Sequence, residues 1–419
     1  MSTDTVDDPT DALPSDRQDE RLAQEEGLAG AFQAFRRRVA GGDLGMIPVV
    51  LGLVAIAVVF YAQDVTFLSS SNLVNITLAA VPYGIISIGI VLVLILGEID
   101  LSVGSVSGVA ASITAVLFVN QDQPLVVAIL AGALTGTAIG LLYGLVFTKI
   151  GVPSFVITLA GLLAFIGLQY VVLGDEGTIN IPRTSALARF SREGFLNETV
   201  SYVLVVVIVG AYVAVNLVGM RRRRAAGLSA PTPSLLAFKA AAMLVGFGYL
   251  TFYLNIGKGL GYAFLLFVGL VVVMDLVLRK TRWGRHLFAV GGNVEAARRS
   301  GIKVTRVYIT AFMLTGTFAA VGGLMFMAKL TAVSQSSGSN DVNLTAIAAA
   351  VIGGTSLFGG RGSTYSALLG TLVLVSITSG LNRIDVDSSV RYIVTGGVLL
   401  LAVSIDSVAR RARSSSGRG

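Results

Sequence analysis

Apolar runs about 20 residues long recur along almost the whole chain, separated by short polar or charged stretches. A bilayer core of roughly 30 Å takes about 20 helical residues to cross, and a helix satisfies its own backbone hydrogen bonds in hydrocarbon. The pattern therefore predicts an all-α polytopic membrane protein with about 12 transmembrane helices, within a range of roughly 10–14. The predicted spans are residues 46–62, 78–97, 102–119, 125–147, 155–173, 199–218, 236–254, 262–278, 307–328, 344–357, 365–381 and 392–405.

The distribution of charged residues predicts the orientation of these spans in the membrane. Hydrophobic residues make up 54% of the chain and charged residues only 13%. The basic residues gather in short runs that fall on one side under this count, which makes that side and both termini cytoplasmic. These runs are residues 36–38, 221–224, 279–306 and 410–418. Because they lie between apolar segments, the net charge of +7 does not indicate nucleic-acid binding.

The same reading divides the chain into one membrane domain and two tails. Residues 1–45 form a cytoplasmic, largely disordered acidic tail, since the first 30 residues hold nine acidic side chains against Arg17 and Arg21. Residues 46–406 form the transmembrane domain, interrupted by a cytoplasmic loop at 279–306. Residues 407–419 form a basic cytoplasmic tail.

Enzymatic chemistry is not expected on this chain. It has no cysteine, so neither a thiol nucleophile nor a thiolate metal site is available. Its single histidine, His286, has no partner with which to form a metal site or a catalytic triad. No phosphate-binding G-x-x-x-x-G-K-[ST] motif occurs. We therefore expect no catalytic residue, no metal and no cofactor.

Four glycines at strict four-residue spacing form a stripe within one predicted span: Gly132, Gly136, Gly140 and Gly144. Such a stripe lets another helix approach backbone to backbone. We expect helix packing inside one subunit, with a pore-lining or dimer surface as the alternative.

Polar residues and glycines interrupt the apolar pattern at two related places. Residues 97–104 and 353–360 share the pattern G-x-x-x-L-x-x-G at the end of an apolar run, which suggests glycine-broken helices and an internal repeat, although so short a match can arise by chance. Glu98 and Asp100 are costly in hydrocarbon, so they either carry protons or stabilise a helix break, with Asp100 capping the helix that follows. The candidate pore or helix-break residues are Glu98, Asp100, Ser102, Gly353, Gly354 and Thr355.

A short, well-terminated helix is predicted in the cytoplasmic loop. Asn293 is a good N-cap, Glu295 and Arg298 suit the two ends of the helix dipole, and Gly301 can end the helix in the left-handed conformation. Two turns isolated in water would not persist. The helix therefore either docks into a partner protein, with Gly291-Gly292 and Gly301 as hinges, or packs on the chain's own helix ends.

Four blocks resemble the permease subunits of bacterial monosaccharide ABC importers, the group of ribose, arabinose and xylose permeases. They are residues 97–105 (GEIDLSVGS), 153–159 (PSFVITL), 284–302 (GRHLFAVGGNVEAARRSGI) and 346–363 (AIAAAVIGGTSLFGGRGS). In that family, the loop with Glu-Ala-Ala and a later glycine is the helix that fits an ATPase subunit. The resemblance therefore implies an ATPase-coupling role for Gly292, Asn293, Glu295, Ala296, Ala297, Arg298 and Gly301.

The resemblance also implies partners: a second permease copy, a cytoplasmic ABC ATPase that hydrolyses the ATP, and an extracellular or periplasmic sugar-binding protein. The added segment at residues 199–278 is similar to the longer xylose-type permeases, which favours xylose. The family usually has Gly-Gly-Ile-Asp at residues 97–100 and Glu-Leu-Asp at residues 343–345, where this chain differs. The alternatives are an ion-gradient carrier that uses Glu98 or Asp100, and a membrane scaffold that transports nothing.

Overall fold

The computed structural model describes residues 46–398, together with 30, 33, 36, 400 and 404. The described chain forms two compact units. One unit contains residues 197–256, and the other contains residues 46–196 and those from 257 onward. The predicted tails, 1–45 and 407–419, and the end of the predicted span 392–405 lie outside the described residues, apart from the few positions named above.

The smaller unit contains a hairpin of two long helices, α8 (Glu198–Ala225) and α9 (Pro233–Asn255). The side chain of Asn197 caps α8 by accepting a hydrogen bond from the Val200 amide at 3.2 Å. The span predicted here ended at residue 218, but α8 continues through the four arginines. Arginine is a good helix former, and cations suit the negative C-terminal end of a helix.

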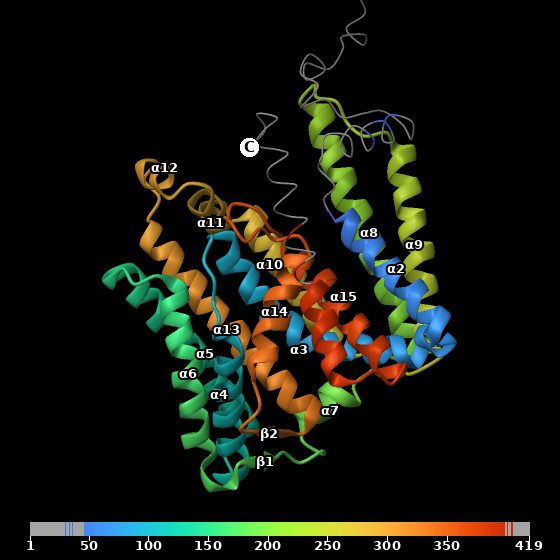
Figure 1. Cartoon of the computed structure of the whole chain (residues 1–419). Helices are drawn as coiled ribbons and strands as arrows, with labels where there is room; N and C mark the ends of the chain where they lie inside the picture. Colours follow the sequence, from blue (N-terminus) through green and yellow to red (C-terminus); the bar gives the residue numbers. More distant parts are fainter. Residues whose placement is uncertain are drawn as a thin grey trace, which may run out of the picture. The chain divides into compact units, whose positions relative to one another are not determined.

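The larger unit is a bundle of helices joined by short connections (Figure 1). Its helices are α2 (Ile47–Gln63), α3 (Ser70–Ile95), α4 (Val103–Ala115), α5 (Leu125–Leu145), α6 (Ser154–Leu173), α7 (Ala186–Arg192), α10 (Tyr262–Lys280), α11 (Arg282–Gly292), α12 (Val294–Arg299), α13 (Val304–Leu330), α14 (Asn340–Ile352) and α15 (Thr364–Arg383). The turns η2 (Val65–Leu68) and η5 (Gly174–Glu176) are 3₁₀-helical, and η3 (Val116–Asn120) and η4 (Val146–Ile150) extend α4 and α5 as π-helical turns.

The core of the larger unit is built around α3. Every residue from 84 to 96 is buried, and α13, α10 and α15 pack around this helix. Helix α13 also runs along α4 and α5, so it joins the first and last parts of the unit. Hydroxyls tie the helices where the side chains are small: Thr315 Oγ1 donates to the Gly89 carbonyl at 2.9 Å, and Ser87 Oγ donates to the Ala346 carbonyl at 3.0 Å.

Helix α14 is too short to cross a bilayer alone, since it has 13 residues, or roughly 20 Å at 1.5 Å per residue. Helix α4 also has 13 residues, but it continues through η3 to Asn120. An irregular segment at residues 96–102 precedes α4, and another at residues 353–363 follows α14. The predicted span 344–357 was therefore wrong at its end, because Gly353 and Gly354 stop the helix and Gly354 has a φ of +103°.

Among the described residues, nine helices are long and apolar enough to cross a membrane. Two shorter apolar helices, Ile47–Gln63 and Asp341–Ile352, lie where further spans were predicted. The polytopic helical architecture agrees with the prediction, whereas the total of about 12 spans and the orientation of the termini stay predictions.

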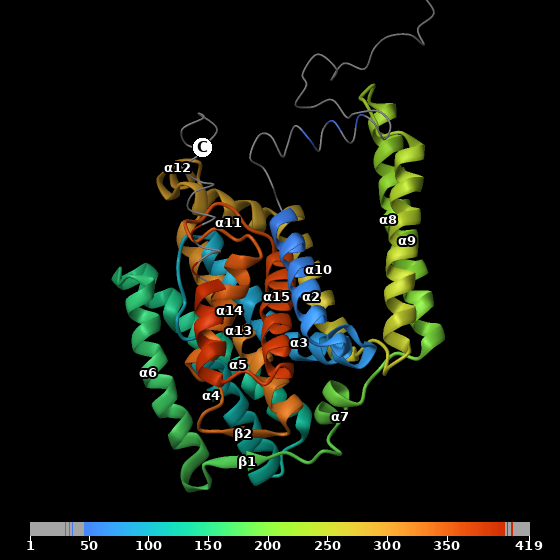
Figure 2. The ribbon, with the colours of Figure 1, turned by 45° about the vertical axis from the view of Figure 1, so that its right-hand side comes forward.

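A short strand pair lies at the end of the larger unit remote from α11 and α12 (Figure 2). Strand β1 (Thr178–Asn180) pairs antiparallel with β2 (Ala332–Ser334), with Ile179 opposite Val333. Gln169 Nε2 on α6 donates to the Ser334 carbonyl at 2.7 Å. The all-α prediction missed this pair, since three-residue strands leave almost no periodicity in a sequence.

Candidate functional site

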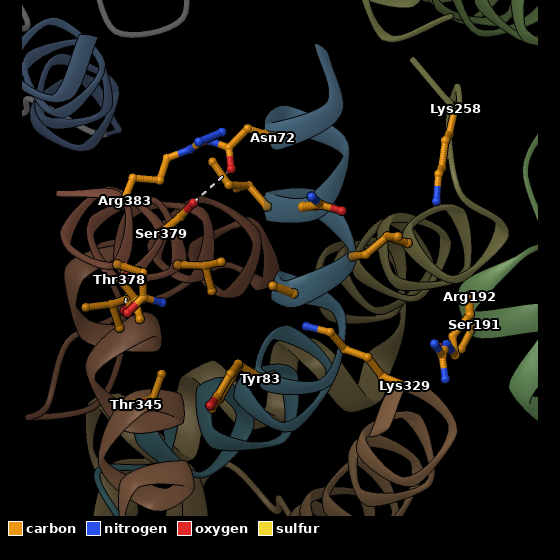
Figure 3. A pocket seen from close by; sticks show the side chains of 17 residues that line it. Asn72, Tyr83, Ser191, Arg192, Lys258, Lys329, Thr345, Thr378, Ser379 and Arg383 are labelled. Carbon is orange, nitrogen blue, oxygen red and sulfur yellow. Dashed lines mark hydrogen bonds between the residues drawn. The ribbon is translucent and has the colours of Figure 1, made fainter. Parts of the chain in front are cut away.

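A polar cavity of about 800 Å³ opens among α3, α7, α13 and α15 in the larger unit (Figure 3). Its lining combines amides, hydroxyls and amines with a few apolar side chains. The polar lining residues are Asn72, Asn75, Tyr83, Ser191, Arg192, Lys258, Lys329, Thr345, Thr378, Ser379, Asn382 and Arg383. Amides and hydroxyls both donate and accept hydrogen bonds, so the cavity suits a ligand rich in hydroxyl groups.

Part of the cavity wall is fixed by its own hydrogen bonds. Asn72 Nδ2 on α3 donates to the Phe67 carbonyl at 2.6 Å, and Ser379 Oγ on α15 donates to Asn72 Oδ1 at 3.2 Å. Asn72 therefore holds α3 and α15 together. Lys329, the penultimate residue of α13, differs: its amine points into the cavity in Figure 3, and no ion pair to it is present among the described residues.

An ion pair lies at the edge of the cavity. Arg383 Nη1 approaches Asp64 Oδ2 at 3.4 Å and donates to Thr66 Oγ1 at 3.0 Å. Hydrogen bonds from the Thr66 hydroxyl and amide hold the pKa of the Asp64 carboxyl below its ordinary value. Asp64 therefore stays ionised at neutral pH and keeps Arg383 partnered.

A second cavity of about 400 Å³ adjoins the first one. The two share Tyr83, Thr345, Leu374 and Thr378, and the second continues to Asp341 on α14 and to Arg391. Tyr83 meets the ring of Phe326 edge to face, with centroids 4.8 Å apart. The four shared residues therefore form a wall common to the two cavities.

At the other end of α3, the helices α11 and α12 form a separate feature of the larger unit (Figure 1). Ile95 and Asn72 are 23 residues apart on one helix, which corresponds to roughly 35 Å. Asn293 Oδ1 caps α12 by accepting from the Ala296 amide at 2.9 Å, and Gly301 has a φ of +79°, as the sequence predicted. Both ends of this six-residue helix are thus fixed locally.

The faces of α12 differ. Glu295, Ala296 and Arg298 are exposed, and Arg298 Nη1 approaches Glu295 Oε1 at 3.0 Å. Ala297 is only 4% exposed and packs against the chain itself. Trp283 Nε1 on α11 donates to Thr310 Oγ1 on α13 at 2.7 Å, and this hydrogen bond holds the start of α11 against α13. The helix therefore rests on its own bundle and presents Glu295 and Ala296 outward.

The carboxylates of the segment before α4 have different surroundings. Asp100 is buried, and its Oδ1 accepts from the Ser102 amide at 2.8 Å and from Ser102 Oγ at 2.7 Å. Tyr143 extends this series of hydrogen bonds, because its hydroxyl donates to Ser102 Oγ at 2.8 Å. Glu98 is partly buried and accepts from Ser154 Oγ.

The predicted capping role of Asp100 was wrong in detail. Helix α4 begins at Val103, so the amide held by Asp100 belongs to the N-cap residue Ser102 and not to the first turn. The Gly104 amide of that first turn donates instead to Asn343 Oδ1 on α14. Periodicity could not place this cap, because its acceptor is 239 residues away in sequence.

The other predicted break residues lie in the 353–363 segment. Gly353 packs against α15, where an added Cβ would come within 1.9 Å of the Ser366 carbonyl oxygen. Thr355 is 1% exposed, and its hydroxyl has no partner among the described residues. Neither Gly353 nor Thr355 lines the two cavities described above.

The glycine stripe of α5 faces α4 and α13. An added Cβ would lie 2.2 Å from Thr114 Oγ1 at Gly132, 2.2 Å from the Gly316 oxygen at Gly136 and 2.2 Å from the Phe312 oxygen at Gly140. At Gly144 it would lie 2.7 Å from the Ile309 Cα. These positions leave no room for a side chain.

Comparison with known proteins assigns the family. A family model described as "Branched-chain amino acid transport system / permease component" matches residues 72–403. The chain is 34% identical over 370 residues to the xylose transport system permease protein XylH of Escherichia coli K12, covering 88% of this chain and 93% of that protein. The chain belongs to this permease family.

Two further relatives define the group within the family. XylH of Haemophilus influenzae is 35% identical over 365 residues, which cover 86% of this chain and 96% of the relative. The ribose import permease protein RbsC of Bacillus subtilis is 29% identical over 356 residues, covering 85% and 91%. The chain is thus a permease of the monosaccharide ABC importer type and a multi-pass protein of the bacterial cytoplasmic membrane, as its four sequence blocks implied. No solved structure gives a significant match.

The cavity of this permease was not predicted from its sequence. Its lining residues come from five helices and a loop, and positions as distant as Asn72 and Arg383 meet there. No motif joins them, and single asparagines or threonines in apolar runs are common. The available signals were Lys329 and Arg383, each a cation in the last turn of a long apolar helix.

Proposed function

We propose that the permease forms, with a second copy of itself, the path by which a monosaccharide enters the cell, and that xylose is its preferred sugar. The observation that carries the proposal is the likeness to xylose permeases at 34–35% identity over nearly their full lengths. The hydroxyl- and amide-rich cavity supports it, because a sugar offers many hydroxyls to such groups.

Energy would come from a separate cytoplasmic ABC ATPase that binds α12. The exposed Glu295 and Ala296 support this docking. The hydrogen bond from Trp283 on α11 to Thr310 on α13 supports it as well, because it fixes α11 to the bundle. An external sugar-binding protein would deliver the sugar to the 800 Å³ cavity, at the end of α3 remote from α11. In this arrangement the termini are cytoplasmic, and the permease itself hydrolyses nothing.

Reconstituted uptake tests this function. Proteoliposomes that contain the permease are loaded with the candidate ABC ATPase and supplied with the candidate sugar-binding protein and labelled xylose. We expect uptake to require all three proteins and ATP. We also expect unlabelled xylose to compete with this uptake more effectively than unlabelled ribose. Uptake without ATPase that collapses with an uncoupler would establish an ion-driven carrier instead.

Lys329 provides a test of the cavity. Replacing it with methionine keeps the length of the side chain and removes the amine. We expect the KM for sugar uptake to rise about tenfold, because hydrogen bonds from a charged group contribute roughly 1.5–3 kcal/mol. Leu330→Met is the control, since Leu330 is 61% exposed and lies outside the cavity lining. An unchanged KM for Lys329→Met would remove Lys329 from the sugar path.

Asp100 separates the proposed importer from an ion-driven carrier. Asparagine at this position can still accept hydrogen bonds from Ser102, although a neutral acceptor gives bonds roughly half as strong. We expect Asp100→Asn to keep ATP-driven uptake within about threefold of the unmodified protein. A proton-carrying role predicts a complete loss of uptake, because an amide cannot take part in the proton cycle.

A further inference from the structure

Three segments of the permease meet at glycines beside α11. The Gly360 amide donates to the Ile95 carbonyl at 2.8 Å, which joins the 353–363 segment to the end of α3. Gly291, near the end of α11, lies against the same carbonyl. An added Cβ at Gly359 would lie 2.7 Å from the Gly291 oxygen and 3.0 Å from the Gly97 nitrogen. We call Gly97, Gly291, Gly359 and Gly360 the glycine junction.

Gly291 and Gly359 leave no space for a side chain. At Gly291 a Cβ would come within 1.8 Å of the Ile95 oxygen and 3.0 Å of the Gly360 nitrogen. Both neighbours are backbone atoms, so a side chain cannot rotate away to relieve the contact. Gly97, Gly359 and Gly360 also have φ values of +81°, +81° and +73°, which disfavour other residues.

Each segment at the junction leads to a different part of the transport machinery. Gly291 is one residue from the end of α11, and α12 follows directly. Ile95 ends α3, whose other half lines the 800 Å³ cavity. The 353–363 segment leads into α15, which lines both cavities. The end of α11 therefore lies against the backbone of the end of α3 and of the segment that leads into α15.

A second connection lies beside the junction. Asp275 on α10 accepts from Arg279 Nε at 2.9 Å and from Ser363 Oγ at 3.1 Å. Ser363 is the N-cap of α15. Because α10 runs into α11 through a single residue, Thr281, this network holds the start of α15 to the base of α11.

We infer that the glycine junction makes the end of α11, the end of α3 and the 353–363 segment move as one body, so that a partner's push on α12 reaches α3 and α15 together. The inference rests on the proposed function. Gly97, Gly291, Gly359 and Gly360 are positioning residues, which contact neither sugar nor ATP.

Two glycines on adjoining helices test the inference. Gly291→Ala forces apart the α11 and α3 backbones, whereas a Cβ at Gly269 on α10 would meet no atom of the described chain within 4 Å. We expect Gly291→Ala to lower sugar uptake per ATP hydrolysed about tenfold, within the range for mutations of a coupling network, while the assembled complex keeps its basal ATPase activity. Gly269→Ala should stay within about twofold of the unmodified protein, as for most substitutions without contacts.

The unmodified complex is measured beside both variants. If it does not couple ATP to uptake, the proposed function fails. If it does and Gly291→Ala equals it in uptake per ATP, or if Gly269→Ala loses as much as Gly291→Ala, only the junction fails.

Gly360→Ala provides a second, milder test that does not depend on the stability of Gly291→Ala. A Cβ at Gly360 would lie 3.3 Å from the Gly292 Cα and 3.6 Å from the Gly291 oxygen, so the backbones need to move apart by only a few tenths of an ångström. We expect folded protein whose sugar uptake per ATP hydrolysed falls about threefold, a smaller loss than that of Gly291→Ala. Uptake per ATP equal to that of the unmodified protein would overturn the inference.

Discussion

Gly136→Leu should prevent the permease from folding. At this position α5 and α13 touch backbone to backbone: an added Cβ at Gly136 would lie 2.2 Å from the Gly316 oxygen, and one at Gly316 would lie 2.1 Å from the Gly136 oxygen. Over-packing a core side chain costs about 1–3 kcal/mol, and here the backbones themselves must separate. We expect a loss of at least about 3 kcal/mol, since the dispersion contacts along both helices are lost with the close approach.

The measurement is the yield of monodisperse protein in detergent and its melting temperature. Gly167→Leu on α6 is the matched control, because a Cβ there would meet no described atom within 4 Å. The control should be recovered at the level of the unmodified protein. Equal recovery of Gly136→Leu would mean that the α5–α13 contact does not hold the bundle together.

Ala296→Trp should uncouple the permease while leaving it folded. Ala296 is exposed on α12, so a large ring there does not disturb the bundle, but it would occupy the surface proposed for the ATPase. A bulky residue in a packed interface displaces the partner's closest contacts, and the loss of such contacts commonly costs 2 kcal/mol or more, roughly a thirtyfold change. We expect ATP-driven uptake to fall by at least that factor.

Ala297→Trp should fail differently from Ala296→Trp. Ala297 is 4% exposed and faces its own chain, so the ring would disrupt α12 itself and reduce the yield of folded protein. Ala226→Trp, on the exposed turn after α8, is the control for adding an exposed indole and should transport normally. Normal ATPase binding and uptake by Ala296→Trp would exclude α12 as the docking helix.

The sequence could predict the features that depend on neighbouring residues. Apolar runs predicted the long helices, and the N-cap Asn293 and the terminal Gly301 predicted both ends of α12. The Asp275–Arg279 pair follows from i,i+4 spacing on one helix. Each of these depends on contacts within about one helical turn, which periodicity and capping rules describe directly.

Features that depend on distant residues could not be predicted in this way. The first turn of α4 is capped by Asn343, although Asp100 was the nearer candidate. The cavity combines α3 with α15, and β1 pairs with β2 from 154 residues later, as in the register of Ile179 with Val333. The glycine junction could not be predicted from the sequence either, because glycines in a sequence do not show which backbone will lie beside them.

The cap that Asn343 provides for Gly104 has a consequence for biosynthesis. The ribosome completes α4 long before it makes α14, so during insertion the first turn of α4 lacks the acceptor that it has in the finished protein. The hydroxyl of Thr315, which binds the Gly89 carbonyl, also arrives late. The first half of the nascent chain is therefore an unfinished structure, and it stays dependent on water or on the insertion machinery until the last helices arrive.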